Sequence, residues 1–274
     1  MSDSCSHDCK SCGSDCADRK APQSFLAELN KASKVSRVVA VASGKGGVGK
    51  SLTTALLAVM ARRKGLRVGL LDADITGPSA PKIFGVKGPA VMTDEGVLPA
   101  TTRTGIDLVS LNLLLPDETE PVIWRGPVIA GAVKQFWTDV VWKDIDVLFL
   151  DMPPGTGDVP LTVYQSIPVD AAVIVSTPQE LVGQIVGKSV RMASKMNIPV
   201  KALVENMAYF ECPGCHQRHP LFGESRLRQS AEQYAIPVTA GLPLDPNLAA
   251  LCDQGKIEDF AGDWLDPVLE TCLA

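Results

Sequence analysis

The sequence predicts an α/β protein with a three-layer, doubly wound and mostly parallel sheet. From residue 35 onward, short apolar segments such as VVAVAS, VLFLDM and AAVIVST recur along the chain, and stretches with helical spacing separate them. Continuous apolar strands are typical of a parallel sheet that helices cover on both faces. The alternation of strands and helices is the pattern of the doubly wound fold. A chain of 274 residues is long enough to build this fold as one core.

The expected elements follow the chain in order. Residues 22–34 space Phe25, Leu26 and Leu29 as on one face of a short lead-in helix. A long helix is expected at LTTALLAVMARR (52–63), and Gly65 is placed to end it in a left-handed conformation. The expected strands are VVAVAS (38–43), LRVGLLDAD (66–74), IDLVSLNLL (106–114), VLFLDM (147–152), AAVIVST (171–177) and VKALVENM (200–207).

A phosphate-binding loop is indicated at residues 44–51, which read GKGGVGKS. This segment fits the P-loop pattern and lies between an apolar strand and a helix, where that loop belongs. Backbone N–H groups at the helix N-terminus then point at phosphate oxygens. Lys50 is expected to reach the β- and γ-phosphates of ATP, and Ser51 to coordinate Mg²⁺. The alternative is a glycine-rich turn without a ligand. The predicted nucleotide contacts are Gly44, Lys45, Gly46, Gly47, Val48, Gly49, Lys50 and Ser51.

Three aspartates at strand ends support a nucleotide site. Asp151 ends VLFLD as a Walker B carboxylate does, and PPGTGD follows it as a glycine loop able to sense a γ-phosphate. Asp72 and Asp74 end LRVGLLDAD, and two residues of a strand spaced by two share one side of it. One of the pair can order the Mg²⁺ shell and the other the attacking water. The plainer interpretation is that all three are capping or turn residues.

Composition narrows the class of protein. The formal net charge is −5, which argues against a surface that neutralises nucleic acid or anionic lipid. No apolar run reaches the roughly 20 residues that cross a bilayer, and the N-terminus lacks a signal-peptide core. We therefore expect a cytoplasmic protein with no membrane and no nucleic-acid partner. In that compartment cysteines stay reduced, so the clustering of six of the eight indicates metal or redox chemistry.

One cysteine group is the C-x₂-C knuckle of Cys212 and Cys215 in ECPGCHQRH. Such a knuckle can put two thiolates on one metal centre. A four-iron cluster generally needs four thiolates, so two knuckles that meet across a two-fold axis would complete a [4Fe–4S] site. Zinc is the main alternative because His216 and His219 lie close by, although their spacing is tighter than in the usual finger. A metal-free redox pair is the third interpretation.

The second group lies in residues 1–20, a cysteine-rich N-terminal tail with almost no bulky apolar side chains. Its four thiols are enough to ligate a [4Fe–4S] cluster within one chain. Without a ligand, such a segment does not offset its own ordering entropy. Zinc or an unmetallated tail is the alternative, and Cys252 and Cys272 are interpreted as ordinary core or surface thiols. The tail cysteines are Cys5, Cys9, Cys12 and Cys16.

Several motifs together carry a family resemblance. Lys45, a second lysine within KGGVGKS, resembles the deviant Walker A motif of the ParA/MinD-type ATPases. Together with LLDADITGPS, VIWRGP, LFLDMPPGTGD, ENM, ECPGCH and LPLDP, it makes residues 35–260 resemble the Mrp/ApbC-like iron–sulfur carrier ATPases. Some members of that family carry an N-terminal four-cysteine cluster, but the C-x₃-C-x₂-C-x₃-C spacing here departs from the longer first gap of those proteins.

The resemblance implies roles for individual residues. It implies a nucleotide-dependent homodimer in which Lys45 reaches the partner's phosphates and counters transition-state charge. Asn206 would contact adenine, since a carboxamide offers both a donor and an acceptor. Asp74 would position the attacking water. A cluster would bridge the dimer at Cys212 and Cys215.

The sequence thus predicts a P-loop ATPase domain at 35–260, with the knuckle at 212–215, between an N-terminal tail (1–20) and a C-terminal tail (261–274). The predicted function is an ATP-hydrolysing scaffold that assembles [4Fe–4S] clusters and transfers them to apoproteins, with slow hydrolysis because ATP acts as a switch.

Two alternatives remain. A MinD- or ParA-like positioning ATPase with a zinc knuckle would need a basic amphipathic end to bind membrane, whereas residues 255–274 are acidic. A nitrogenase-reductase-like electron donor usually takes one cysteine from each of two separated segments.

Overall fold

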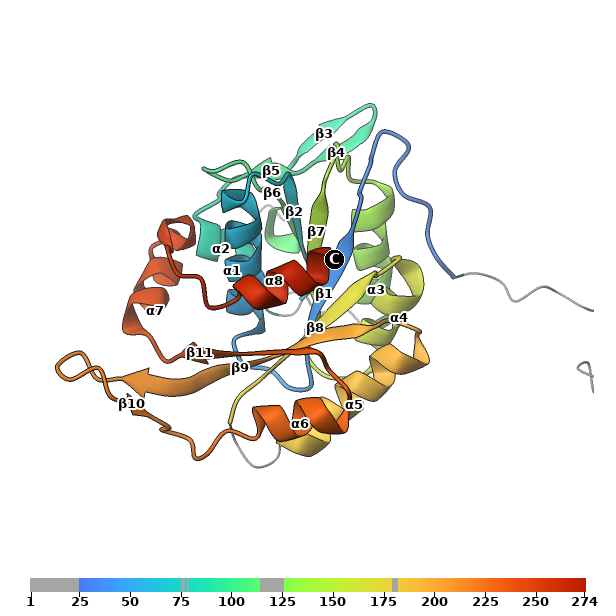
Figure 1. Cartoon of the computed structure of the whole chain (residues 1–274). Coiled ribbons are helices and arrows are strands. Elements are labelled where there is room, and N and C mark those ends of the chain that lie inside the picture. The colour runs from blue at the N-terminus through green and yellow to red at the C-terminus, as the bar shows by residue number, and fades with distance from the viewer. Residues whose placement is uncertain (1–24, 75–76, 78, 114–125, 179–181) are drawn as a thin grey trace, which may run out of the picture.

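The computed structural model describes residues 25–74, 77, 79–113, 126–178 and 182–274, and its centre is a nine-stranded sheet (Figure 1). Parallel pairing joins the central strands, and among the described strands of this sheet the antiparallel pairs are those of β10 with β9 and β5 with β6. The predicted parallel sheet is confirmed. Across the sheet the order is β10 (Arg218–His219), β9 (Val200–Glu211), β8 (Ala171–Ser176), β1 (Val38–Ser43), β7 (Val147–Asp151), β2 (Val68–Asp72), β6 (Asp107–Ser110) and β5 (Ala100–Thr101), while β11 (Val238–Pro243) pairs with β9.

Helices cover both faces of this sheet and make the three layers that the sequence predicts. One apolar cluster joins the sheet to α1 (Lys50–Arg63), α2 (Ala80–Phe84), α7 (Pro246–Asp253) and α8 (Asp266–Leu273). A second cluster joins it to α3 (Gly126–Thr138), α4 (Asp158–Ser166), α5 (Val182–Lys195) and α6 (Leu227–Gln233). Every residue of β1, β2, β7 and β8 is buried, which is why these strands are apolar up to their last residue.

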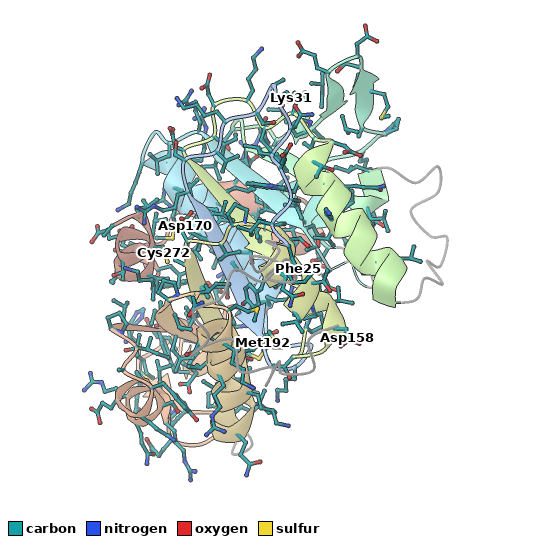
Figure 2. The ribbon with its side chains drawn as sticks, turned by 90° about the vertical axis from the view of Figure 1, so that its right-hand side faces the viewer. Phe25, Lys31, Asp158, Asp170, Met192 and Cys272 are labelled. Carbon is teal, nitrogen blue, oxygen red and sulfur yellow. The ribbon has the colours of Figure 1, made fainter. Side chains whose placement is uncertain are left out.

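The predicted lead-in helix is wrong for the described residues 25–34, which form no helix. Phe25 is 70% exposed and lies on the surface seen in Figure 2, and Leu26 is 51% exposed. The Asn30 side chain accepts a hydrogen bond from the backbone N–H of Ala32, and such local bonds compete with helix formation. The segment instead runs along the body, where Leu29 packs against the core.

The C-terminal segment, expected as a tail, ends in helix α8. Val268, Leu269 and Cys272 of this helix are fully buried, so the segment packs on the sheet together with α1. Its apolar positions follow the helical spacing that burial of one face requires. Gly65 has a φ of 86° just beyond α1, as the sequence predicts for a residue that ends this helix.

The remaining elements lie at the periphery. A two-stranded hairpin, β3 (Val91–Thr93) and β4 (Gly96–Leu98), projects from the sheet end near β5 and β6 (Figure 1). Short 3₁₀ turns occupy Leu111–Leu113 and Ile257–Asp259. Within the described ranges, no helix combines the length and the apolar character that a bilayer span requires.

Candidate functional site

The predicted phosphate loop connects β1 to α1, at the edge of the sheet where the parallel strands end. Gly47 and Gly49 have φ values of 77° and 83°, a region that favours glycine. The first turn of α1 contains no acidic residue, and no side chain caps its N-terminus. Its N–H groups therefore face a position that suits an anion.

Two close approaches fix the position of this loop. A Cβ atom on Gly44 would lie 2.0 Å from Ile185 Cγ2 of α5, and one on Gly49 would lie 2.0 Å from Asn206 Nδ2 of β9. Asn206 is buried and donates a hydrogen bond of 3.0 Å to the Val48 carbonyl. Gly44 and Gly49 therefore let the loop backbone pack closely against α5 and β9. The glycines also allow the loop to curve.

Lys50 meets two of the predicted carboxylates. Its Nζ atom lies 2.6 Å from Asp151 Oδ1 and 3.6 Å from Asp74 Oδ2. The Thr54 hydroxyl lies 3.2 Å from the same Asp151 oxygen, while Asp151 Oδ2 is buried and has no hydrogen-bond partner among the described residues. Asp151 reaches this place because β7 pairs with β1 in the register that puts Val41 beside it. The structure therefore brings together residues that the sequence places on three separate segments.

Asp72 is fully buried, and both of its carboxylate oxygens are occupied. Burial, reinforced by the neighbouring charge of Asp151, raises the pKa of Asp72 to about 7. Hydrogen bonds to Asp72 thus fix the positions of Asp74, Ser79 and Ala80, which follow β2 in the chain. The donors to Asp72, at 3.1 to 3.3 Å, are the backbone N–H groups of Asp74, Ser79 and Ala80 and the hydroxyl of Ser110.

The oxygen atoms around Lys50 suit a magnesium ion. Hard cations prefer carboxylate and hydroxyl oxygens, and Ser51 Oγ lies 3.4 Å from Lys50 Nζ. The unpartnered Asp151 Oδ2 is the observation that fits best, because a buried carboxylate oxygen normally has a partner. Lys45 lies on the same loop and is partly exposed.

The cysteine knuckle lies in the turn that joins β9 to β10. The Cys212 backbone N–H donates to Gln217 O at 3.0 Å, and the His216 N–H donates to Cys212 O at 2.8 Å. The backbone N–H of Cys215, followed by that of Gly214, lowers the pKa of the Cys212 thiol. Cys215 is exposed and Cys212 is partly exposed, so both thiols are accessible and Cys212 favours the thiolate that binds metals.

The nearby histidines do not complete a metal site with the two cysteines. His216 Nδ1 lies 3.2 Å from Glu211 Oε1, and His219 belongs to β10, where it pairs with Phe210. No three histidine, cysteine, aspartate or glutamate side chains gather to hold a metal ion within the described part of the chain. Within the described residues, the two cysteines and the two histidines therefore do not gather into a Cys₂His₂ site.

Beside the knuckle the structure has a groove of about 470 Å³ that sequence patterns do not reveal. Tyr209, Cys212, Pro243, Asp245 and Trp264 are among the residues that line it. Because these residues come from three separate segments, only the tertiary structure brings them together. The tail cysteines Cys5, Cys9, Cys12 and Cys16 lie outside the described residues, and their cluster stays a prediction.

A strand–P-loop–helix unit in a parallel sheet, with a strand-end aspartate against the loop lysine, defines a P-loop nucleoside triphosphatase. Residues 34–263 match the family model described as ParA: NUBPL iron-transfer P-loop NTPase. The chain belongs to this family.

Individual relatives agree with the family. The chain is 44% identical over 237 residues to an iron-sulfur cluster carrier protein of Clostridium perfringens, an alignment that covers 84% of this chain and 83% of that one. It is 42% identical over 258 residues to an iron-sulfur cluster carrier protein of Methanocaldococcus jannaschii, with 92% and 89% covered.

Solved structures show the same fold. A nucleotide-binding protein of Archaeoglobus fulgidus in complex with ADP superimposes with a TM-score of 0.78 at 45% identity, covering 85% of this chain and 91% of that one. The MinD cell division protein of Aquifex aeolicus gives a TM-score of 0.58 at 18% identity, with 86% and 94% covered, and shows a likeness of fold alone.

Proposed function

We propose that this protein binds and hydrolyses ATP in order to assemble [4Fe–4S] clusters and transfer them to apoprotein acceptors. The observation that carries the proposal is the accessible thiol pair of Cys212 and Cys215 on a nucleoside triphosphatase of an iron-transfer family. Thiolates are the usual ligands of iron–sulfur clusters. The names of the relatives, iron-sulfur cluster carrier proteins at 42–44% identity, support the same cargo.

In the proposed nucleotide site, Lys50 binds the β- and γ-phosphates. A bound triphosphate competes with Asp151 and Asp74 for its ammonium group, which lies within 3.6 Å of both. Asp74 is then released to accept a hydrogen bond from the attacking water. Ser51 and Asp151 hold Mg²⁺, which when bound neutralises charge on the phosphate oxygens.

The other two nucleotide contacts follow from the family. Asn206 borders the phosphate loop at Val48, and its carboxamide is proposed to recognise the adenine edge. Lys45 is proposed to act on the phosphates of the partner in a homodimer, where its charge stabilises the transition state. Hydrolysis is expected to be slow, because ATP binding serves to close the dimer.

The cargo site is proposed to form between two chains. Each knuckle supplies two thiolates, and a four-iron cluster generally takes four, so a two-fold axis that brings two knuckles together completes the ligand set. The cluster is transferred from this dimer interface to apoprotein acceptors in the cytoplasm. No membrane or nucleic-acid partner takes part. The cysteines of residues 1–20 are proposed to hold a second cluster within one chain.

Anaerobic purification with iron and acid-labile sulfide analysis tests the proposal. The carrier model predicts iron and sulfide in equal amounts, a dimer when ATP is present, and loss of the cluster to an apoprotein acceptor. The positioning-ATPase alternative predicts zinc or no metal at the knuckle. A wild-type protein that stays colourless and monomeric with iron, sulfide and ATP would exclude the carrier function.

A further inference from the structure

Ser110 is a fully buried polar side chain at the end of strand β6, where the two preceding residues, Leu108 and Val109, are apolar. Its hydroxyl donates a hydrogen bond of 3.3 Å to Asp72 Oδ2. A hydroxyl that leaves water for the protein interior costs free energy unless it is hydrogen-bonded. An alanine would fill nearly the same space without that cost, so the serine requires a role beyond packing.

Strand pairing places Ser110 in a row of polar side chains at the edge of the sheet. Strands β7, β2 and β6 lie side by side (Figure 1), and Asp72 of β2 is in register with Asp151 on one side and with Ser110 on the other. Residues in register on parallel strands face the same side of the sheet. The row therefore runs from Asp151, which contacts Lys50, through Asp72 to Ser110.

The Asp72 carboxylate joins Ser110 to the segment that follows β2. Its Oδ1 atom accepts from the Asp74 N–H at 3.1 Å. Its Oδ2 atom accepts from the N–H groups of Ser79 and Ala80 at 3.1 and 3.2 Å, in addition to the Ser110 hydroxyl. Among the described residues, three of these donors belong to the segment itself and only Ser110 comes from a neighbouring strand. Ser110 thus fixes the carboxylate relative to the sheet.

Asp74 is the residue whose position depends on this arrangement. Its Oδ2 atom lies 3.6 Å from Lys50 Nζ, and its side chain is 14% exposed. Its N–H is held by Asp72, and its carbonyl accepts from the Gly77 N–H at 3.2 Å. Because the backbone of Asp74 is bonded to the Asp72 carboxylate, a rotation of that carboxylate would move Asp74 relative to Lys50.

We propose that Ser110 is a positioning residue for ATP hydrolysis. Its hydroxyl fixes the Asp72 carboxylate, and Asp72 in turn fixes Asp74 where it orients the attacking water. Ser110 supports hydrolysis without supporting phosphate binding, because the lysine and the N–H groups that bind phosphate belong to α1 and the loop before it. This inference rests on the proposed function in one respect, namely that Asp74 orients the attacking water.

Steady-state ATP hydrolysis by the full-length chain with Mg²⁺ tests the inference, and titration with a fluorescent ATP analogue measures binding. Ser110→Ala removes one oxygen atom, so the fold is retained. Its kcat is expected to fall about tenfold, the effect of losing one hydrogen bond that supports the transition state. The Kd of the analogue is expected to stay within about twofold, because an interaction that acts on the transition state leaves ground-state binding unchanged.

A double-mutant cycle shows whether Ser110 acts through Asp72. Asp72→Asn is expected to lower kcat about a hundredfold, since an amide keeps only one of the two acceptor oxygens and Asp74 is misplaced. In that background, Ser110→Ala is expected to change kcat by less than about twofold, because the acceptor of its hydroxyl is already altered.

Ser189→Ala is the matched control for the loss of a buried hydroxyl. Ser189 is 2% exposed, and its hydroxyl donates to the Ile185 carbonyl within α5 at 3.4 Å. Both kcat and the Kd of the analogue are expected to equal the wild-type values in this variant. A loss of kcat that is specific to Ser110→Ala therefore reports on the bond to Asp72.

The inference is overturned if Ser110→Ala keeps the wild-type kcat, if it weakens nucleotide binding as much as it lowers kcat, or if the two single losses multiply in the double variant. A wild type that hydrolyses ATP, with normal turnover in Ser110→Ala, contradicts the positioning role alone. A wild type without hydrolysis contradicts both this role and the proposed ATPase. The expected pattern in a protein that binds no iron–sulfur cluster contradicts the carrier function and supports the positioning role.

Discussion

The Lys50 ammonium lies 2.6 Å from the Asp151 carboxylate, and the two side chains are only 6% and 1% exposed. Two opposite charges at this depth compensate each other's loss of hydration. The pair therefore keeps the lysine extended toward the strand end, where its partner Asp74 also lies. Removal of the Lys50 charge leaves the buried Asp151 carboxylate without this compensating positive charge.

Lys50→Ala is accordingly expected to abolish ATP hydrolysis and ATP binding, because it removes the main charge on the β- and γ-phosphates. It is also expected to lower the free energy of unfolding by about 3–5 kcal/mol, the usual cost of leaving one member of a buried pair alone. Nucleotide titration and urea unfolding measure the two effects. Lys64→Ala is the control, since Lys64 forms exposed ion pairs and its loss should change neither quantity appreciably. Normal turnover in Lys50→Ala would contradict the phosphate-site assignment.

Gly49→Ala is expected to destabilise the protein and weaken ATP binding. The backbone at Gly49 has a φ of 83°, which costs an alanine about 1–2 kcal/mol. The added Cβ would also lie 2.0 Å from Asn206 Nδ2 and displace this side chain from Val48. Gly46→Ala is the matched control for stability, because no atom lies within 4 Å of its added Cβ. Equal unfolding midpoints for the two variants would disprove the packing argument.

The buried Asp72 predicts a specific pH dependence of stability. Its pKa of about 7 in the folded protein lies above the ordinary value of 3.8, so between these values the folded state binds the proton that the unfolded chain has released. Its contribution to the free energy of unfolding therefore falls as pH rises from about 4 to 7. Asp72→Asn removes this titration, although the amide leaves some backbone donors without an acceptor.

Urea unfolding of wild type and Asp72→Asn across this pH range tests the sign. The wild type should be the more stable protein near pH 4, and the difference should shrink toward pH 7. Asp94→Asn, in the exposed turn between β3 and β4, controls for the loss of one carboxyl group. A difference that grows with pH would show that the folded protein prefers charged Asp72.

Local motifs predict the phosphate loop and its aspartates, because a P-loop carries its chemistry in contiguous residues and parallel strands end at one edge. The pairing of β7 with β1, which brings Asp151 to Lys50, depends on strand order, and no local pattern specifies it. The same holds for the bulge in β9, where residues 206–208 lie opposite the single Leu242 of β11, since VKALVENM has the pattern of an ordinary strand.

The predictions for residues 25–34 and for the C-terminal segment differ from the structure for two separate reasons. At residues 25–34 the apolar spacing predicts a helix, but the chain turns at Asn30 instead. The Asn30 side chain there accepts a hydrogen bond from the backbone N–H of Ala32. At α8 the apolar residues pack against the core, so the acidic segment predicted as a C-terminal tail ends in a helix. Local hydrogen bonding therefore accounts for the first segment and tertiary packing for the second, and the sequence of the second segment alone does not show which surface it will cover.

The knuckle thiols give the most direct test of the cargo site. Replacement of both Cys212 and Cys215 by serine is expected to remove the shared cluster, a loss of about two irons per chain if a four-iron cluster bridges two chains. The fold should be unaffected, because the knuckle is a surface turn held by backbone hydrogen bonds that serine preserves. Iron and sulfide analysis and circular dichroism measure the two outcomes. Cys252→Ser, at a partly exposed position on α7, is the matched control and should keep the iron. Iron that remains after the double replacement, but is lost when Cys5, Cys9, Cys12 and Cys16 are replaced, would place the cluster on the tail instead of the knuckle.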